Sequence, residues 1–357
     1  MPSLRLTDRE NAQLSCVGSG LVTLDIVVDR ESPDEYMVRS GGSCGNVMTI
    51  LAYLGWNTYP IARLGQDNAA SMVLDDFTLF GVDTTFITCD ETASTPAIIE
   101  GVRNSRNGSR THSYTLYCPQ CGNFMLRYRA IPQALTGRVV NELGEAQVFY
   151  FDRLSKGILD LARHYREQGA LVVFEPSAIK DQRLFNRAAR FSHILKYAYD
   201  RLSDVSGVLE DYTVPLEIQT LGREGLRYRR STGKAQRAPW QYMPAYRVSD
   251  VVDEAGAGDW CTSGIIHSLG RYGVKSFWRT RNSGIGKALK LGQALAAVNC
   301  RFKSARGAMY SLSRYELNTA VLELAKGQSL GSGKEMDVQG NLSELLQSVC
   351  ARCSQGA

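Results

Sequence analysis

The chain has 357 residues, of which 44% are hydrophobic and 22% are charged. This mixture is typical of a globular protein with a buried core, and it excludes a disordered or fibrous chain. The formal net charge is only +5. Because so small an excess suits an anionic small molecule as well as a nucleic acid, it gives no argument for nucleic-acid binding.

The cell compartment follows from the N-terminus and the cysteines. Residues 1–11 are charged and lack the apolar run of a signal peptide. No stretch approaches the roughly 18 apolar residues that a membrane-spanning helix needs. The nine cysteines are an odd number, and several lie in apolar surroundings, which indicates reduced thiols. We therefore expect a cytoplasmic protein without a membrane partner.

Short apolar runs alternate with helical periodicity along most of the chain. In chain order the pattern predicts strands within 14–28, 59–64, 148–151 and 171–174, and helices over 47–54, 73–80 and 158–165. The first of these runs is interrupted at Gly18 and Gly20. Continuous apolar strands joined by amphipathic helices predict a parallel sheet that is covered on both faces. The expected fold class is therefore a doubly wound α/β domain.

Two regions depart from this alternation. The segment 95–117 is polar and β-leaning, with turn residues at 104–109, and predicts a hairpin outside the main sheet. The segment 327–340 contains four glycines and few apolar residues, so we interpret it as a linker. The expected organisation is a main domain over 12–326, followed by this linker and a tail over 341–357 with one short helix.

The segment from Asp253 to Trp260 carries the strongest chemical signal. Its small residues at 255–258 allow backbone N–H groups to approach an anion, and a helix N-terminus favours phosphate there. A carboxylate beside that site, Asp259, is suited to accept a proton from an attacking hydroxyl. A glycine-rich turn with an ordinary helix-start aspartate is the alternative interpretation.

Further motifs occur in a fixed order around this segment. They stand at Gly41–Asn46, Leu54–Gly55, Gly65–Asp67, Thr220–Gly225 and Asp253–Asp259. The ordered set resembles the ribokinase-like (PfkB) carbohydrate kinase family over roughly residues 12 to 325. The resemblance implies a mostly parallel sheet flanked by helices, and a small β lid from about 27–39 and 95–117. Residues 16–25 resemble the family's first strand, which ends in a substrate-binding aspartate.

The resemblance also implies roles for single residues. Asp259 would be the catalytic base, and the backbone of Gly256, Ala257 and Gly258 would form an anion hole. The implied substrate-binding residues are Asp25, Gly42, Asn46, Arg110 and Asp152. The implied nucleotide-binding residues are Thr220, Gly222, Gly225 and Asn299. The implied site of a monovalent cation such as K⁺ includes Asp253. Purely local roles for Asp25, as a strand-end residue, and for Asn46, near a helix start, remain open.

The function that this resemblance implies is an ATP-dependent kinase, with Mg²⁺ on the phosphates, acting on a hydroxyl of a sugar or nucleoside. A homodimer through the lid is a candidate assembly. Some positions depart from the family pattern: Glu254 follows Asp253, Glu175-Pro176-Ser177 replaces D-P-N, and Arg201 stands where N-x-x-E would place a glutamate. Asp200 could supply part of the metal shell through water. The alternative is a nucleotide- or sugar-binding regulatory protein with weak or no transfer.

Two C-x-x-C pairs lie far apart in the sequence. Cys118 and Cys121 flank a turn of the zinc-knuckle form C-P-x-C-G, and Cys350 and Cys353 lie near the C-terminus. Together they could supply a tetrahedral Cys₄ zinc site that pins the tail to the knuckle at 118–121. Redox use of either pair and plain surface thiol chemistry are the competing interpretations.

Other chemistries find little support in the sequence. The four histidines form no H-E-x-x-H pair, and the sequence contains no G-x-S-x-G elbow. The basic run 227–237 is typical of a solvated hairpin, so we expect no nucleic-acid partner.

Overall fold

The computed structural model describes residues 14–29, 36–104, 110–209, 212–231, 237–327 and 341–354. Its main sheet has nine strands in the order β13-β12-β11-β10-β9-β8-β1-β4-β5. In chain order these strands are β1 (Ser15–Ser19), β4 (Asn57–Gly65), β5 (Ile87–Asp90), β8 (Val148–Phe151), β9 (Leu171–Phe174), β10 (Ile194–Ala198), β11 (Leu216–Thr220), β12 (Gly225–Arg230) and β13 (Gln241–Pro244).

Strand β1 marks the point where the strand order reverses. It pairs in parallel with β4 on one side and with β8 on the other. The parallel arrangement continues through β9, β10 and β11, and only β12 and β13 run antiparallel. In open α/β sheets, ligands bind beyond the carboxyl ends of the strands at such a reversal. The topology therefore indicates where to look for a site.

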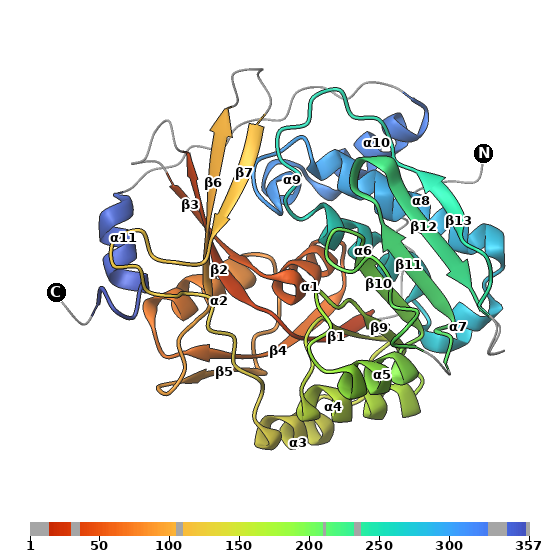
Figure 1. The fold of residues 1–357 in the computed structure, drawn as a ribbon, viewed down its shortest axis with the longest axis horizontal. Coiled ribbons are helices and arrows are strands. Elements are labelled where there is room, and N and C mark those ends of the chain that lie inside the picture. Colours follow the sequence, from red (N-terminus) through yellow and green to blue (C-terminus); the bar gives the residue numbers. More distant parts are fainter. Residues whose placement is uncertain are drawn as a thin grey trace.

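Helices cover both faces of this sheet (Figure 1). One face packs on α1 (Ser43–Tyr53), α6 (Ala257–Leu269), α8 (Asn282–Asn299), α9 (Gly307–Ser311) and α10 (Arg314–Ala325). The other face packs on α3 (Gln133–Glu142), α4 (Lys156–Glu167) and α5 (Gln182–Phe191). Neighbouring residues such as Phe149 and Tyr150 enter opposite layers, because side chains alternate along a strand. The short α7 (Gly273–Arg279) lies beside β9.

A second sheet has the order β3-β2-β6-β7. It consists of β2 (Thr23–Asp29), β3 (Tyr36–Gly41), β6 (Ala97–Asn104) and β7 (Arg110–Thr115). Helices α2 (Asn68–Leu79) and α11 (Leu342–Val349) share a hydrophobic cluster with it, and α11 contacts α2. Figure 1 shows these four strands beside the main domain, with α11 at their outer edge. We call this four-stranded sheet the lid sheet.

The structure confirms most of the predicted elements. Strands 148–151 and 171–174 have the predicted bounds, and the helical stripe over 158–165 lies within α4. The segment 95–117 forms the antiparallel pair β6–β7 outside the main sheet, although its turn at 105–109 lies outside the described residues. So does the predicted linker after residue 327. No helix in the described part of the chain is long and apolar enough to cross a bilayer.

Two expectations for the first strands are wrong. Gly18 does not interrupt β1, since the strand continues to Ser19. Asp25 does not end the first strand, because the chain leaves the main sheet at Gly20 and residues 23–29 join the lid sheet. A side chain at Gly20 would place its Cβ 1.5 Å from Asp152 Oδ1. This close approach explains why a glycine stands where the chain changes sheets.

Candidate active site

The candidate active site lies where the carboxyl ends of β8 and β9 meet the first turns of α1 and α6. Asp152 follows β8, Glu175 follows β9, Asn46 lies in the first turn of α1, and Asp259 lies in the first turn of α6. The turn before α6 is open to solvent: Gly258 is exposed, and its neighbours on either side are partly exposed. Residues of the predicted motifs Gly41–Asn46 and Asp253–Asp259 are therefore brought to one accessible place.

The glycine-rich turn has a fixed shape. Gly256 has a φ of 70°, and a Cβ there would lie 2.1 Å from the carbonyl oxygen of Ala305. Buried Asp253 accepts hydrogen bonds from the backbone N–H groups of Ala255 and Ser304, both at 2.7 Å. These contacts hold the turn before α6 against the loop that contains Ser304 and Ala305. The first amides of α6 therefore point out of the helix end. Cation binding by Asp253 stays a prediction.

Asn299 supports the same turn from the end of α8. Its Nδ2 donates to the carbonyl oxygens of Ala255 and Ala305, both at 3.2 Å, and its Oδ1 accepts from the Ala308 N–H at 3.1 Å. The side chain is fully buried. The structure therefore gives Asn299 a role in positioning the turn. Contact between Asn299 and a nucleotide stays a prediction.

Asn46 and Asp259 meet although 213 residues separate them. Asn46 Nδ2 donates a hydrogen bond of 2.7 Å to Asp259 Oδ2. The Oδ1 atom of Asn46 is buried and accepts no hydrogen bond from the described residues. A buried acceptor without a partner carries a free-energy cost. A neighbouring hydroxyl of a bound substrate, other than the one that gives its proton to Asp259, could remove this cost by donating to Asn46 Oδ1.

The carboxyl group of Asp259 has an unusual proton affinity. Burial is the largest cause, and with the negative charge of Glu175 it raises the pKa of Asp259 to about 7. The hydrogen bond from Asn46 and the charges of Lys196 and Arg201 act in the opposite direction and lower this pKa. A base works best when its pKa is close to the pH of the reaction. The site therefore gives Asp259 a pKa suited to proton abstraction near neutral pH.

A buried ion pair lies directly behind this carboxylate. Lys196 Nζ contacts Glu175 Oε1 and donates to the carbonyl oxygen of Gly258 at 3.2 Å. Thr262 Oγ1 donates to Glu175 Oε2 at 2.7 Å, and the Tyr150 hydroxyl lies 3.2 Å from the same oxygen. The pair thus supports, from the interior of the protein, the turn at residues 253–258, which we call the phosphate turn. In the sequence, Glu175 stands out only as a departure from the family's D-P-N pattern, and no motif marks Lys196. The signal that could have found Glu175 is its position directly after a buried parallel strand.

We expect the turnover rate to rise with pH through about 7. A base acts in its deprotonated form, so protonation of Asp259 below pH 7 should lower kcat, and the rate should level off above pH 8. The Glu175→Gln variant should move this profile to lower pH, because the charge of Glu175 raises the pKa of Asp259. A pH series of kcat for both proteins measures the shift. The control is Glu142→Gln, which changes an exposed carboxylate on α3, and an unshifted profile in Glu175→Gln would contradict the assignment.

Asp152 lies at the same edge of the main sheet, directly after β8. Its Oδ1 accepts a hydrogen bond of 2.9 Å from the Leu21 N–H, and its Oδ2 pairs with Arg153 at 2.8 Å. Burial raises the pKa of this carboxyl. Gly42 lies nearby with a φ of 77°, and a Cβ there would lie 2.5 Å from the Leu21 carbonyl oxygen. Asp152 and Gly42 therefore meet at the loop between β1 and β2.

Asp25 lies on β2 of the lid sheet, and its carboxylate lies against Gly41. A Cβ at Gly41 would be 1.9 Å from Asp25 Oδ2. Thr23 Oγ1 donates to Asp25 Oδ1 at 2.6 Å. Burial is the largest cause that raises the pKa of Asp25 to about 6. The lid therefore brings a partly exposed carboxylate to the start of the Gly41–Asn46 motif, which fits a hydrogen-bond acceptor for substrate hydroxyls.

Three of the residues that are expected to bind the nucleotide lie at the turn between β11 and β12. Thr220 ends β11, Gly222 is exposed with a φ of 58°, and Gly225 begins β12 with a φ of 113°. Arg223 in this turn pairs with Glu254 at 2.8 Å, which places the turn beside the phosphate turn. Both partners are exposed, so the pair adds little stability. Nucleotide contact at Thr220, Gly222 and Gly225 stays a prediction.

Two further residues are Arg110, on the lid sheet, and Tyr128, in the segment between β7 and α3. Arg110 begins β7, and its side chain lies outside what the structure describes. Tyr128 was missed. Its hydroxyl is buried without a hydrogen-bond partner among the described residues, and the charges of Asp152 and Arg153 act on it. Tyr128 belongs to no sequence motif, and it comes near Asp152 only because its loop folds toward that residue.

The four cysteines of the two C-x-x-C pairs also come together. Their sulfur atoms all lie within 4.8 Å of one another. Cys350 directly follows α11, and Figure 1 shows α11 on the opposite side of the lid sheet from α6. The group is therefore a second site, separate from Asp259.

The order of the main sheet, the helices on both of its faces and the lid sheet define a ribokinase-like α/β protein. Residues 11–115 match the model of the pfkB family carbohydrate kinases. The chain is 27% identical over 276 residues to an aminoimidazole riboside kinase of Salmonella typhimurium strain LT2, covering 71% of this chain and 80% of that protein. The resemblance to the ribokinase-like (PfkB) carbohydrate kinase family is thus confirmed, and the enzyme class is a phosphotransferase with an alcohol acceptor.

Solved structures share the fold at lower sequence identity. The aminoimidazole riboside kinase of Salmonella enterica, complexed with aminoimidazole riboside and an ATP analogue, has a TM-score of 0.63 at 23% identity, covering 86% of this chain and 99% of that one. A fructokinase with bound ATP from Xylella fastidiosa has a TM-score of 0.64 at 18% identity, covering 88% and 100%. These similarities establish the fold and leave the substrate open.

Proposed function

We propose that this protein is an ATP-dependent kinase that phosphorylates a hydroxyl group of a sugar or of the sugar part of a nucleoside. The observation that carries the proposal is the hydrogen bond between Asn46 and Asp259. It joins the start of α1, on the substrate side, to the start of α6, on the phosphate side. One carboxylate is thus within reach of both a bound hydroxyl and an arriving phosphoryl group.

The proposed reaction uses this chain's residues as follows. Asp259 accepts the proton of the substrate hydroxyl while that oxygen forms a bond to the γ-phosphorus, and the bond from the γ-phosphorus to the β-phosphate oxygen breaks, releasing ADP. The amides of Gly256, Ala257 and Gly258 stabilise the charge on the transferred group. The substrate is oriented by Asn46 and by Asp25 from the lid. Most of the rate acceleration then comes from positioning and charge stabilisation.

Mg²⁺ would enter with the nucleotide, since it binds phosphate oxygens and keeps several waters of its own. The residues present are compatible with this, because one or two carboxylates suffice. The exposed candidates are Glu254, in the phosphate turn itself, and Asp200, which precedes the Arg201 whose charge acts on Asp259. The metal would neutralise charge on the phosphates. Arg201, where a glutamate was expected, adds a positive charge that already acts on Asp259.

The test is ADP release in a coupled assay with ATP, Mg²⁺ and a panel of acceptors. The panel contains aminoimidazole riboside, fructose and ribose, which the similar proteins act on or bind by name, together with further nucleosides and hexoses. We expect one acceptor to raise ADP release well above the rate with water alone. Mass spectrometry of the product should show one added phosphoryl group. No acceptor-dependent release from any member would contradict the proposal.

A second candidate function is a regulatory protein that binds a nucleotide or sugar without efficient transfer. Arg201 in place of the expected glutamate, and the pairing of Glu254 with Arg223, favour it. Calorimetry distinguishes the two functions. Binding of ATP and of a sugar with no product formed over hours would support the regulator, whereas turnover would exclude it.

A further inference from the structure

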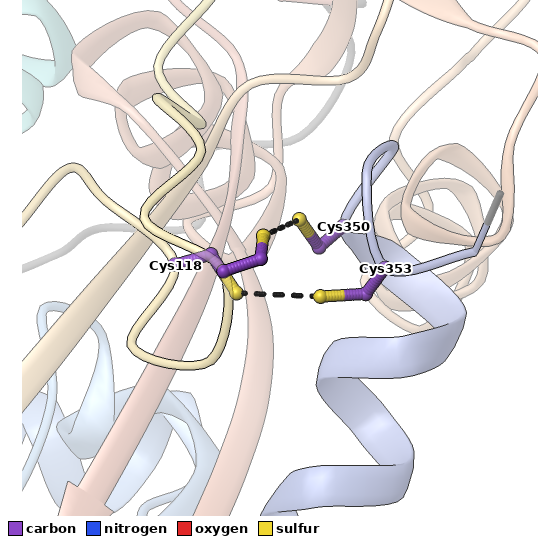
Figure 2. A group of neighbouring side chains, drawn as sticks. Cys118, Cys350 and Cys353 are labelled. Atoms are coloured by element: carbon purple, nitrogen blue, oxygen red, sulfur yellow. Dashed lines mark hydrogen bonds between the residues drawn. The ribbon is translucent and has the colours of Figure 1, made fainter. Parts of the chain in front are cut away.

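We infer that Cys118, Cys121, Cys350 and Cys353 form a structural zinc site that fastens the C-terminal helix α11 to the segment that follows β7 of the lid sheet. The site is separate from the proposed kinase reaction and does not depend on it. The sulfur atoms of Cys121 and Cys350 are 3.5 Å apart, and those of Cys118 and Cys353 are 3.7 Å apart. Figure 2 shows the two sulfur pairs facing each other across the gap between the knuckle and the chain end.

These separations match a tetrahedral zinc site and not a disulfide. Four sulfurs at the usual Zn–S distance of about 2.3 Å are separated by about 3.8 Å along each edge of the tetrahedron. A disulfide bond would require about 2.05 Å. All four sulfurs lie within 4.8 Å of one another, so a single ion at their centre can contact each of them. Two isolated redox pairs would have no reason to converge in this way.

The backbone around each pair has the geometry of a zinc knuckle. The N–H groups of Gln120 and Cys121 bond to the sulfur of Cys118, and those of Arg352 and Cys353 bond to the sulfur of Cys350. Both halves of the site thus offer the same two donors to the first cysteine. Hydrogen bonds of this kind stabilise a metal-bound thiolate. Asn123 adds a donor from Nδ2, 3.7 Å from the sulfur of Cys350.

The surroundings of the site indicate a structural function. Cys118 and Cys350 are each 1% exposed and belong to the hydrophobic cluster of the lid sheet and α2. Leu345, Leu346 and Val349 of α11 are buried in the same cluster. Four protein thiolates fill a tetrahedral shell and leave no position for a substrate. The metal would therefore stabilise the packing of α11.

The site also reaches the lid and the loop that carries Tyr128. Thr115, the last residue of β7, is three residues from Cys118. The Ala97 N–H at the start of β6 donates a hydrogen bond of 3.1 Å to the carbonyl oxygen of Met125, which lies just beyond the knuckle. Arg127 donates to Asn123 Oδ1 at 2.9 Å. The segment between the knuckle and Tyr128 is thus tied both to the lid and to the cysteine site. Loss of the metal should loosen this segment and α11 together.

The first experiment measures metal content. The chain is expressed with a tag that contains no histidine, purified under reducing conditions, and analysed by mass spectrometry of its metals. We expect about one zinc per chain, lost in Cys350→Ser and retained in Cys89→Ser, which changes an exposed cysteine outside the site. Zinc below half an equivalent in the wild-type protein after reconstitution with zinc alone, or zinc retained in Cys350→Ser, would overturn the assignment.

The second experiment needs no variant and therefore does not depend on whether Cys350→Ser folds. X-ray absorption of the zinc-loaded wild-type protein should show four sulfur ligands at about 2.3 Å. Chelation should lower the melting temperature by about 5 °C, since a metal that binds the folded chain stabilises it. Hydrogen exchange should rise at 118–127 and 342–353 and stay unchanged in β9. A shell with nitrogen or oxygen ligands, or an unchanged exchange pattern, would contradict the proposed site.

Discussion

The Asp259→Asn variant is expected to lower kcat by about a thousand-fold, the size typical of removing a general base. An amide cannot accept the hydroxyl proton, while its size and shape are almost those of the carboxylate. The amide oxygen can still accept the hydrogen bond that Asn46 Nδ2 now gives to Asp259 at 2.7 Å. The measurement is the initial rate of product formation with the acceptor identified in the panel, at saturating ATP.

The control separates chemistry from folding and binding. Asp250→Asn changes an exposed carboxylate in the segment that leads to the phosphate turn, and it should leave kcat within two-fold. ATP affinity, measured by calorimetry, should be similar in all three proteins, because the anion-binding amides are untouched. Turnover in Asp259→Asn equal to that of the wild-type protein would remove the base assignment while leaving the fold assignment intact.

Asn46 and Asp259, which the structure brings together, could both be selected from the sequence as candidate site residues because each lies in a local pattern. Asn46 and Asp259 each follow glycines at the start of a helix, and both helices border the carboxyl edge of one parallel sheet. The main sheet was predictable for a similar reason. A strand that is buried on both faces, such as Val148–Phe151, consists of uninterrupted apolar residues.

The lid sheet was less predictable, because its partners are separated in sequence. β2 pairs with β6 in parallel across about seventy residues, and nothing in the local composition of 23–29 distinguishes it from a strand of the main sheet. The chain changes sheets at Gly20 because the Asp152 carboxylate occupies the space of a side chain there. Only the folded structure brings these two residues together.

Isolated charged residues were the hardest part of the site to predict. Lys196 lies inside the apolar strand β10 and is stabilised by Glu175 from the neighbouring strand end. Its position is explained by a tertiary ion pair and by no motif. The same is true of Arg306, which is 1% exposed and pairs with Asp76 of α2.

Arg306 connects α2 and the lid sheet to the loop before α9. Its Nη2 lies 2.6 Å from Asp76 Oδ2 and 2.9 Å from the hydroxyl oxygen of Ser40 on β3, and it also contacts the Ser40 carbonyl oxygen. Asp76 in turn accepts from the Ser40 N–H at 2.9 Å and from the Tyr310 hydroxyl at 2.6 Å. The charge of Arg306 also lowers the pKa of Asp25, so this pair affects the substrate side of the site.

The Arg306→Met variant is expected to lower the free energy of unfolding by about 3–5 kcal/mol. Removing one partner of a buried pair leaves the other charge without compensation, and here Asp76 would keep only its neutral hydrogen-bond donors. Urea denaturation followed by circular dichroism measures the loss. The pKa of Asp25 should rise further, because the charge of Arg306 lowers it, so any substrate binding that requires its carboxylate should weaken at a higher pH in the variant than in the wild-type protein.

A surface pair provides the matched control for this variant. Arg138 and Glu142 are 2.9 Å apart on α3, with side chains 42% and 53% exposed, and Arg138→Met should cost at most about 1 kcal/mol. Combining Arg306→Met with Asp76→Asn removes the uncompensated charge, so the double variant should be more stable than the sum of the two single losses predicts. If the losses are simply additive, or if Arg306→Met is no more harmful than Arg138→Met, the pair does not hold the lid sheet to the main domain. In that case Asp25 and Asn46 must be aligned by the backbone contacts around Gly41 and Gly42 alone.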